Sequence, residues 1–168
     1  SLYILAGEGG ANVQVDKDAD GLYETVQALT EGEGLFINGG VEVGGRVISD
    51  APVQVDVLTG DIGSTYESRD SSLLPLSLWS TSYYEPVSTV SSAGTTVWLY
   101  NPGLNPLTVA YTTRDGGGAL TTTNLNVPGG VAGGYLKQVI PDGYGAHFEA
   151  ASAFYAFSTT DSTNAANG

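Results

Sequence analysis

Period-two alternation of apolar and polar residues recurs along this sequence and limits it to β structure. In Pro52–Thr59 the side chains of Val53, Val55 and Val57 share one face, and Leu107–Thr112 repeats the pattern. No stretch of ten or more residues places apolar side chains at helical spacing. Clusters of glycine, proline, asparagine and aspartate separate the strands. The sequence therefore predicts an all-β chain, in a sandwich or barrel rather than a parallel sheet with crossover helices.

Two halves of the sequence match at a spacing of about 95 residues. In both halves an apolar strand is followed by a glycine-containing turn, a second strand and an Asp-Gly pair. The matched segments are Leu2–Leu5 with Val97–Tyr100, Asn12–Val15 with Leu107–Ala110, and Asp20–Gly21 with Asp115–Gly116. We therefore expect two related antiparallel β-sandwich units, of jelly-roll or immunoglobulin-like type, from an internal duplication.

The extent of the match sets the expected boundaries. The first unit is expected over residues 1–61, and the second over residues 95–168 with an extended C-terminal tail. Residues 62–94 lie between them and are too apolar for a free linker. Their apolar and aromatic side chains include Leu73, Leu74, Leu76, Trp79, Tyr83 and Tyr84. We expect residues 62–94 to form an ordered connector that packs between the units.

Several turn-and-strand motifs of this chain are similar to those of one known domain family. They are Ile48-Ser49-Asp50-Ala51-Pro52-Val53-Gln54-Val55, Leu74-Pro75-Leu76, Tyr83-Tyr84, Tyr100-Asn101-Pro102, Gly145-Ala146-His147-Phe148 and Phe154-Tyr155-Ala156. Together they resemble the domain named after the amino-terminal region of IgGFc-binding protein, over most of the chain. The resemblance implies an extracellular, non-enzymatic β module used in adhesion, matrix or surface assembly. It does not imply immunoglobulin binding, because the chain lacks the Cys-rich regions of that animal protein.

The charge of the chain excludes some partners and favours others. Its formal net charge is −13, from 18 acidic and 5 basic residues. Such a surface repels nucleic-acid phosphates and anionic lipid headgroups, and it gains stability when divalent cations neutralise its self-repulsion. No apolar run approaches the roughly 20 residues that a membrane span needs. We expect no nucleic-acid partner and no membrane insertion.

The absence of two residue types bears on processing and compartment. The sequence has no methionine, so we expect a processed or excised piece whose export signal has been removed. It also has no cysteine, which excludes disulfides, thiol catalysis and Cys-ligated zinc. With the family resemblance, these features predict a secreted, extracellular or cell-surface protein.

The most specific chemical signal is the segment Asp16–Glu24, in which aspartates at alternate positions precede a glycine. This spacing lets a tight loop aim several oxygens at one hard cation. The expected metal ligands are the side chains of Asp16, Asp18 and Asp20, the backbone carbonyl of Leu22, and Glu24. No helices flank the segment, and Gln27 stands where an EF-hand has its bidentate glutamate. The sequence predicts a calcium-binding hairpin loop, and the alternative is a solvated acidic turn.

The other acidic residues have less specific surroundings. The matching loop of the second half, Arg114–Gly118, lacks the carboxylates, so any metal site is single. Asp50 precedes Ala51-Pro52, and Asp142 follows Pro141. These are turn contexts that need no metal.

Catalytic motifs are missing from the sequence. There is no Gly-x-Ser-x-Gly elbow, no His-Glu-x-x-His and no phosphate loop. The only histidine, His147, lies between Ala146 and Phe148 in an expected strand. A glycosidase needs only two carboxylates, so the 18 acidic residues leave that activity open. We predict that the chain is not an enzyme.

Two functions remain. The favoured one is a structural subunit or repeat of a surface assembly, such as a filament, sheath or adhesin stalk, whose copies associate by strand addition. The segments expected to mediate this are Leu2–Ala6 and the tail Ser158–Gly168. The alternative is a carbohydrate-binding or adhesive module for surface polysaccharide. Its stacking platforms would be Trp79, Tyr83, Tyr84, Trp98 and Tyr144, unless these aromatic residues pack in the core.

Overall fold

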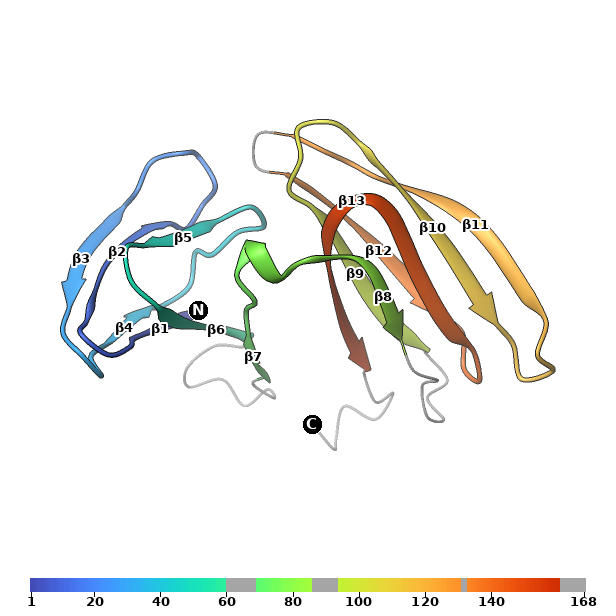
Figure 1. Cartoon of the computed structure of the whole chain (residues 1–168), viewed down its shortest axis with the longest axis horizontal. Helices are drawn as coiled ribbons and strands as arrows, with labels where there is room; N and C mark the ends of the chain where they lie inside the picture. Colours follow the sequence, from blue (N-terminus) through green and yellow to red (C-terminus); the bar gives the residue numbers. More distant parts are fainter. Residues whose placement is uncertain (60–68, 86–93, 131–132, 161–168) are drawn as a thin grey trace. The chain divides into compact units, whose positions relative to one another are not determined.

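The chain folds as antiparallel β-sheets, as its alternation predicts (Figure 1). A computed structural model describes residues 1–59, 69–85, 94–130 and 133–160. Within these residues there are thirteen strands and one short 3-10 turn, η1 (Leu76–Leu78). The chain forms two compact units, Ser1–Leu76 and Ser77–Gly168. Among the described residues no helix has the length and hydropathy that crossing a membrane requires.

The first unit is a sandwich of two antiparallel sheets. One sheet has the order β4 (Gly34–Ile37), β1 (Leu2–Ala6), β6 (Val53–Thr59) and β7 (Arg69–Ser72). The other has the order β3 (Thr25–Leu29), β2 (Ala11–Asp16) and β5 (Arg46–Ser49). Alternate side chains of β1 and β2 point inward and form one core with Leu29, namely Leu2, Ile4, Ala6, Ala11, Val13 and Val15. The two sheets are therefore held together by the apolar face of each.

Three long strands, each bent once, build most of both sheets in this unit. β1 continues into β2, β3 into β4, and β5 into β6, each time crossing from one sheet to the other. The first of these long strands pairs with the other two in both sheets. The bends lie side by side, because the Gly7 N–H donates to the Pro52 carbonyl (3.1 Å) and the Ala6 N–H to the Glu33 carbonyl (3.0 Å).

Gly10 lies at the bend between β1 and β2, where a side chain has no room. Its φ is +79°. A Cβ atom there would lie 2.4 Å from the carbonyl oxygen of Leu29, whereas a Cβ atom on Gly9 would meet nothing within 4 Å. The close approach of two backbones therefore requires glycine at position 10 but not at position 9.

The second unit repeats the same pairing order. Its strands are β8 (Ser80–Glu85), β9 (Thr95–Asn101), β10 (Leu107–Arg114), β11 (Leu120–Val127), β12 (Gly134–Ile140) and β13 (Gly145–Thr160). β9 pairs with β12 and β13, and β10 pairs with β11 and β13. The long strand β13 thus pairs with β10 through its first part and with β9 through its second, and its pairing with β8 has a register shift between Glu149 and Phe154. The core of the second unit contains Val97, Leu99, Val109, Tyr111, Val127, Ile140, Ala146, Phe148 and Phe154.

The strands of the two units correspond in their pairing partners. β9 takes the place of β1, β10 of β2, β11 of β3 and β12 of β4, and the single strand β13 takes the place of β5 and β6. The shared order supports the internal duplication, which stays a prediction.

The expected connector, residues 62–94, is divided between the two units. Its strand β7 pairs with β6 of the first unit, and β8 pairs with β13 of the second. The division between the units falls after Leu76, so the described part of this segment supplies a strand to each unit and is not a separate connector. Residues 62–68 and 86–93 lie outside the described residues.

The segment Leu2–Ala6 was expected to offer an unpaired edge, and this expectation is wrong. It forms β1, which pairs with β4 on one side and β6 on the other. Both of its hydrogen-bonding edges are therefore used within the first unit. Of the expected tail, residues 158–160 belong to β13 and pair with β9, and residues 161–168 lie outside the described residues.

Candidate metal centre

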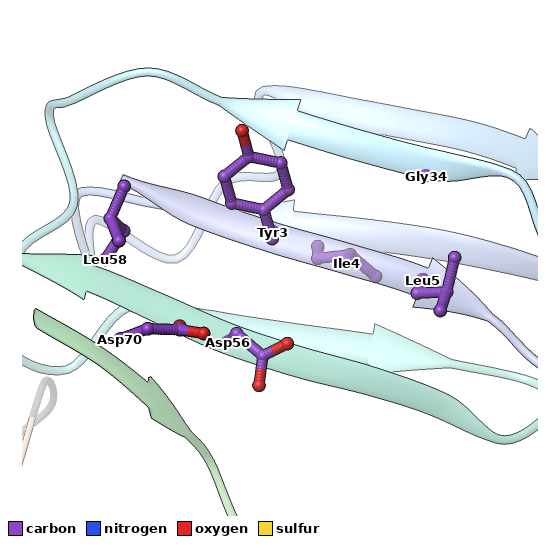
Figure 2. Close-up of a pocket in the computed structure, with 7 residues that line it drawn as sticks. All are labelled: Tyr3, Ile4, Leu5, Gly34, Asp56, Leu58 and Asp70. Atoms are coloured by element: carbon purple, nitrogen blue, oxygen red, sulfur yellow. The ribbon is translucent and has the colours of Figure 1, made fainter. Parts of the chain in front are cut away.

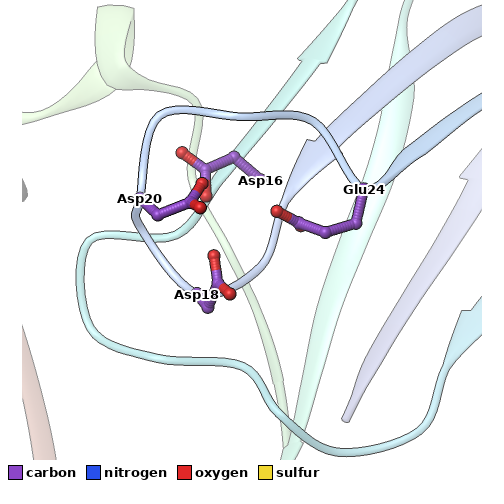
Figure 3. A group of neighbouring side chains, drawn as sticks. All are labelled: Asp16, Asp18, Asp20 and Glu24. Carbon is purple, nitrogen blue, oxygen red and sulfur yellow. The ribbon is translucent and has the colours of Figure 1, made fainter.

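Four carboxylates gather in the loop between β2 and β3 (Figure 3). Asp16 is the last residue of β2, and Asp18, Asp20 and Glu24 follow in the loop. One oxygen of each side chain lies within 4.8 Å of those of the others. Asp16 is 3% exposed, and the other three are exposed. The structure thus brings together all four side chains that the sequence singled out.

Backbone amides hold the loop carboxylates in position. The Gly21 N–H donates to Asp16 Oδ2 (3.0 Å), and the Lys17 N–H donates to Glu24 Oε2 (2.9 Å). The Leu22 N–H donates to Asp20 Oδ1 (2.7 Å). Ala19 and Gly21 of this loop have positive φ angles, 62° and 89°.

One oxygen of Asp16 has no hydrogen-bond partner among the residues that the structure describes. This oxygen is the buried Oδ1 atom. A buried acceptor left unsatisfied costs about 1–3 kcal/mol, and more when it carries charge. Three further carboxylates close to the Asp16 carboxylate add repulsion. A cation among the four side chains would satisfy this oxygen and remove the repulsion.

A second segment fixes the backbone of the loop. The Glu42 N–H donates to the Lys17 carbonyl (2.8 Å). Gly45 packs so closely that a Cβ atom there would lie 2.9 Å from the Lys17 carbonyl oxygen and 3.0 Å from that of Asp16. Asp16 also lies opposite Arg46 in the β2–β5 register. Sequence reasoning missed this support, because residues 42–46 are far from the loop along the chain.

Leu22 and Gln27, which the sequence pattern also singled out, take different positions in the structure. Leu22 was expected to offer its carbonyl, and the contact made by its backbone is the N–H bond to Asp20, so the carbonyl ligand stays a prediction. Gln27 lies in β3 opposite Val13, inside the sheet rather than in the loop. The cluster is therefore one of four carboxylates, a set of oxygen donors that suits hard divalent cations.

The corresponding loop between β10 and β11 is an ordinary turn. Asp115 closes it, because its Oδ1 accepts hydrogen bonds from the N–H groups of Gly117 (2.9 Å) and Ala119 (2.8 Å). The Asp115 N–H also donates to the Ala119 carbonyl (3.1 Å). Within the residues described, the carboxylate cluster of the first unit is the one that could hold a metal.

Asp50 stabilises a bend instead of joining the cluster. Its carboxylate accepts hydrogen bonds from the Asn12 N–H (2.7 Å) and from the Asn12 side-chain amide (2.6 Å). The side-chain bond first, and the backbone bond second, hold the pKa of Asp50 below its ordinary value. A lowered pKa in the folded state stabilises the fold above the unfolded pKa of about 3.9, and this contribution is lost as the pH falls through the folded pKa.

Replacing Asn12 with Ala should therefore raise the pKa of Asp50 toward its ordinary value. The measurement is an NMR titration of the side-chain carboxyl carbons in both proteins. Glu33 is the internal control, because its pKa is lowered by hydrogen bonds that its carboxylate accepts from the Thr30 backbone N–H and hydroxyl. An Asp50 pKa that stays lowered in Asn12→Ala would contradict the assignment of the cause.

The aromatic residues proposed as stacking platforms mostly have packing roles. Tyr83 donates its hydroxyl to the Phe154 carbonyl (2.7 Å), and its ring packs on Phe154. Trp79 packs on Tyr100 and Tyr155, with interplanar angles of 84° and 29°. These rings do not form one flat platform.

The remaining three of the five differ in exposure. Trp98 lies beneath the ammonium group of Lys137 (5.5 Å from the ring centroid), and Tyr144 packs against the core of the second unit. Tyr84 is 77% exposed. It stacks on His147 at 4.2 Å, and His147 Nε2 shares a hydrogen bond with Ser82 Oγ (2.8 Å).

A shallow hollow of about 370 Å³ lies on the outer face of the β4–β1–β6–β7 sheet (Figure 2). Gly34 of β4, which has no side chain, lies opposite Leu5, and both residues line the hollow. Tyr3 and two carboxylates, Asp56 and Asp70, line it. The Asp56 carboxylate accepts hydrogen bonds from Gln54 Nε2 (2.8 Å) and from the Ser72 hydroxyl. Asp56 thus links side chains within its sheet, and the hollow does not present two free carboxylates for acid–base chemistry.

Comparison with protein-family models, curated proteins and solved structures finds no match to this chain. The resemblance to the IgGFc-binding protein domain therefore stays a prediction.

Proposed function

We propose that this chain is a non-enzymatic, calcium-stabilised β-sandwich protein that forms part of an extracellular or cell-surface assembly. The observation that carries the proposal is the buried, unpartnered Oδ1 of Asp16 beside three other carboxylates. A fold that buries a charged oxygen without a partner gains stability when a cation supplies one.

Calcium fits this cluster better than magnesium does. Calcium accepts six to eight oxygen ligands in irregular arrangements, whereas magnesium demands near-ideal octahedral geometry and keeps several waters. Here one buried and three exposed carboxylates leave room for water and for the Leu22 carbonyl to complete the coordination. No sulfur or imidazole ligand lies in the cluster, which disfavours the softer transition metals.

The distribution of charge supports a structural role for the cation. Of the 18 acidic residues, 13 belong to Ser1–Leu76, together with three of the five basic residues. Calcium in this unit would reduce the repulsion within the chain and between copies of it. An assembly of such copies, in a filament, sheath or adhesin stalk, would then depend on calcium. The carbohydrate-binding alternative loses support, because Tyr83 packs against the core and Trp79 against neighbouring rings.

The test is the melting temperature of the purified chain as free calcium is raised. A ligand that binds only the folded form stabilises it by about 2.7 kcal/mol at one hundred times its dissociation constant. The triple variant Asp16→Asn, Asp18→Asn, Asp20→Asn should lose this dependence. A matched control removes three exposed carboxylates elsewhere, with Glu8→Gln, Asp70→Asn and Glu149→Gln, and should keep it. An unmodified chain whose melting temperature is the same in chelator and in millimolar calcium would refute the proposal.

A further inference from the structure

β11 is an unprotected edge strand. It pairs with β10 on one side, and no described strand pairs with it on the other. It has eight residues, Leu-Thr-Thr-Thr-Asn-Leu-Asn-Val, with no charge, no glycine and no proline. Residues 120–124 are all exposed, and Leu120 is 70% exposed. Such an edge presents a row of backbone donors and acceptors to any strand that can reach it.

The other edges of the described sheets are all shorter than β11, and most of them carry a charged residue. Shortness and charge are two usual means of blocking edge-to-edge contact. The other edges are β3 (five residues), β4 (four), β5 (four, with Arg46), β7 (four, with Asp70), β8 (six, with Glu85), β12 (seven, with Lys137) and the six residues Tyr155–Thr160 of β13, which pair only with β9 among the described strands. β11 differs from all of them in combining eight residues with no charge.

We infer that β11 is the surface through which two copies of this chain associate, by antiparallel pairing of β11 with β11; this rests on the proposed self-assembly. The low density of acidic residues around β11 favours a second copy of the chain at this edge. Two chains of net charge −13 repel each other, and the repulsion is weakest where acidic residues are few. The second unit has five acidic and two basic residues, and β11 has none. A two-fold arrangement closes, so it yields a dimer as a building block.

The faces of the sheet restrict the register of this pairing. Thr122 and Asn124 lie on the outer face, opposite Thr112 and Ala110 of β10, and Leu125 packs against the core on the inner face. Residues opposite each other across two paired strands share a face. One residue must therefore face its own copy across the two-fold axis, and the two central registers place Thr123 or Asn124 at that position. In the first, Thr122 faces Asn124, and in the second, Asn124 faces its own copy.

Charge substitutions test the pairing in both registers. Thr122→Lys with Asn124→Lys places like charges opposite each other in either register, which is destabilising. We expect the unmodified chain in millimolar calcium to sediment as a dimer or a larger assembly of dimers, and the lysine variant to be monomeric at the same concentration. The matching glutamate variant should also be monomeric alone. An equal mixture of the lysine and glutamate variants should associate again, because opposite charges then face each other.

Cysteine crosslinking gives a second measurement. The chain has no cysteine of its own, so an introduced thiol is unique. On mild oxidation Asn124→Cys should form an intermolecular disulfide in the register at Asn124, and an equal mixture of Thr122→Cys and Asn124→Cys should do so in the register at Thr123. Thr108→Cys, on the exposed outer face of β10, is the matched control and should remain reduced. Monomeric unmodified chain at high concentration, or a lysine variant that associates as the unmodified chain does, would overturn the inference. The calcium-dependent melting temperature of the same lysine variant should be unchanged, so failure here is distinct from failure of the calcium proposal.

Discussion

Asp16→Asn should melt at a higher temperature than the unmodified chain in chelator and at a lower temperature in millimolar calcium. Without the cation, Asp16 Oδ1 is a buried charged oxygen without a partner, close to three other carboxylates. An asparagine keeps the acceptor for the Gly21 N–H and turns an NH₂ group toward those carboxylates. The calcium-free variant should therefore gain about 1–3 kcal/mol of unfolding free energy.

In millimolar calcium the order of the two melting temperatures reverses, because Asp16→Asn has lost a charged ligand from the carboxylate cluster. Asp20→Asn is the matched control. Its side chain is exposed, so this variant should lose calcium stabilisation without the gain in chelator. The measurement is calorimetric unfolding of the three proteins in both conditions. An Asp16→Asn variant that is less stable than the unmodified chain in chelator would show that Asp16 is satisfied without a metal.

Period-two alternation was enough to predict the individual strands. The segment Pro52–Thr59 forms β6 (Val53–Thr59), and Leu107–Thr112 forms most of β10. β10 runs on to Arg114 because Thr113 and Arg114 pair with Thr121 and Leu120 of β11. An alternating pattern records which face of a strand is buried, and that is a local property of the sequence.

The sequence did not distinguish a hairpin turn from a bend between sheets. Both use glycine, proline and aspartate. Gly7–Gly10 and Asp50–Pro52 bend long strands that keep the same neighbours, whereas residues 17–24 reverse the chain into a hairpin. The pairing of β8 with β13 was also missed, because its partners, such as Ser82 and Glu149, are far apart in sequence.

The site was predicted in its composition but not in its energetics. The alternating aspartates identified the four side chains that the loop brings together. Burial of Asp16 depends on packing by Gly45 and on pairing with β5, which no local pattern encodes. The unpartnered oxygen, which is the strongest argument for a cation, therefore became visible only in the folded chain.

Replacing Gly10 with Ala should destabilise the first unit far more than replacing its neighbour Gly9. Both residues have positive φ angles, +79° and +82°. Alanine at either position therefore incurs about 1–2 kcal/mol for the left-handed backbone. At position 9 the new methyl group meets nothing within 4 Å, and at position 10 it lies 2.4 Å from the Leu29 carbonyl oxygen. The bend must then open, and overpacking of this kind costs about 1–3 kcal/mol more.

The comparison isolates the close approach of β1–β2 to the end of β3, because backbone conformation is matched between the two variants. Denaturant unfolding of both, with the unmodified chain, measures the difference in free energy. The amides of Ala6 and Gly32 form hydrogen bonds across this bend, so their hydrogen exchange shows where the loss of stability occurs. Their protection from exchange should fall in Gly10→Ala and persist in Gly9→Ala. Equal stabilities for the two variants would mean that the bend tolerates a side chain, and that the sandwich is not held closed by contact between its bent strands at this point.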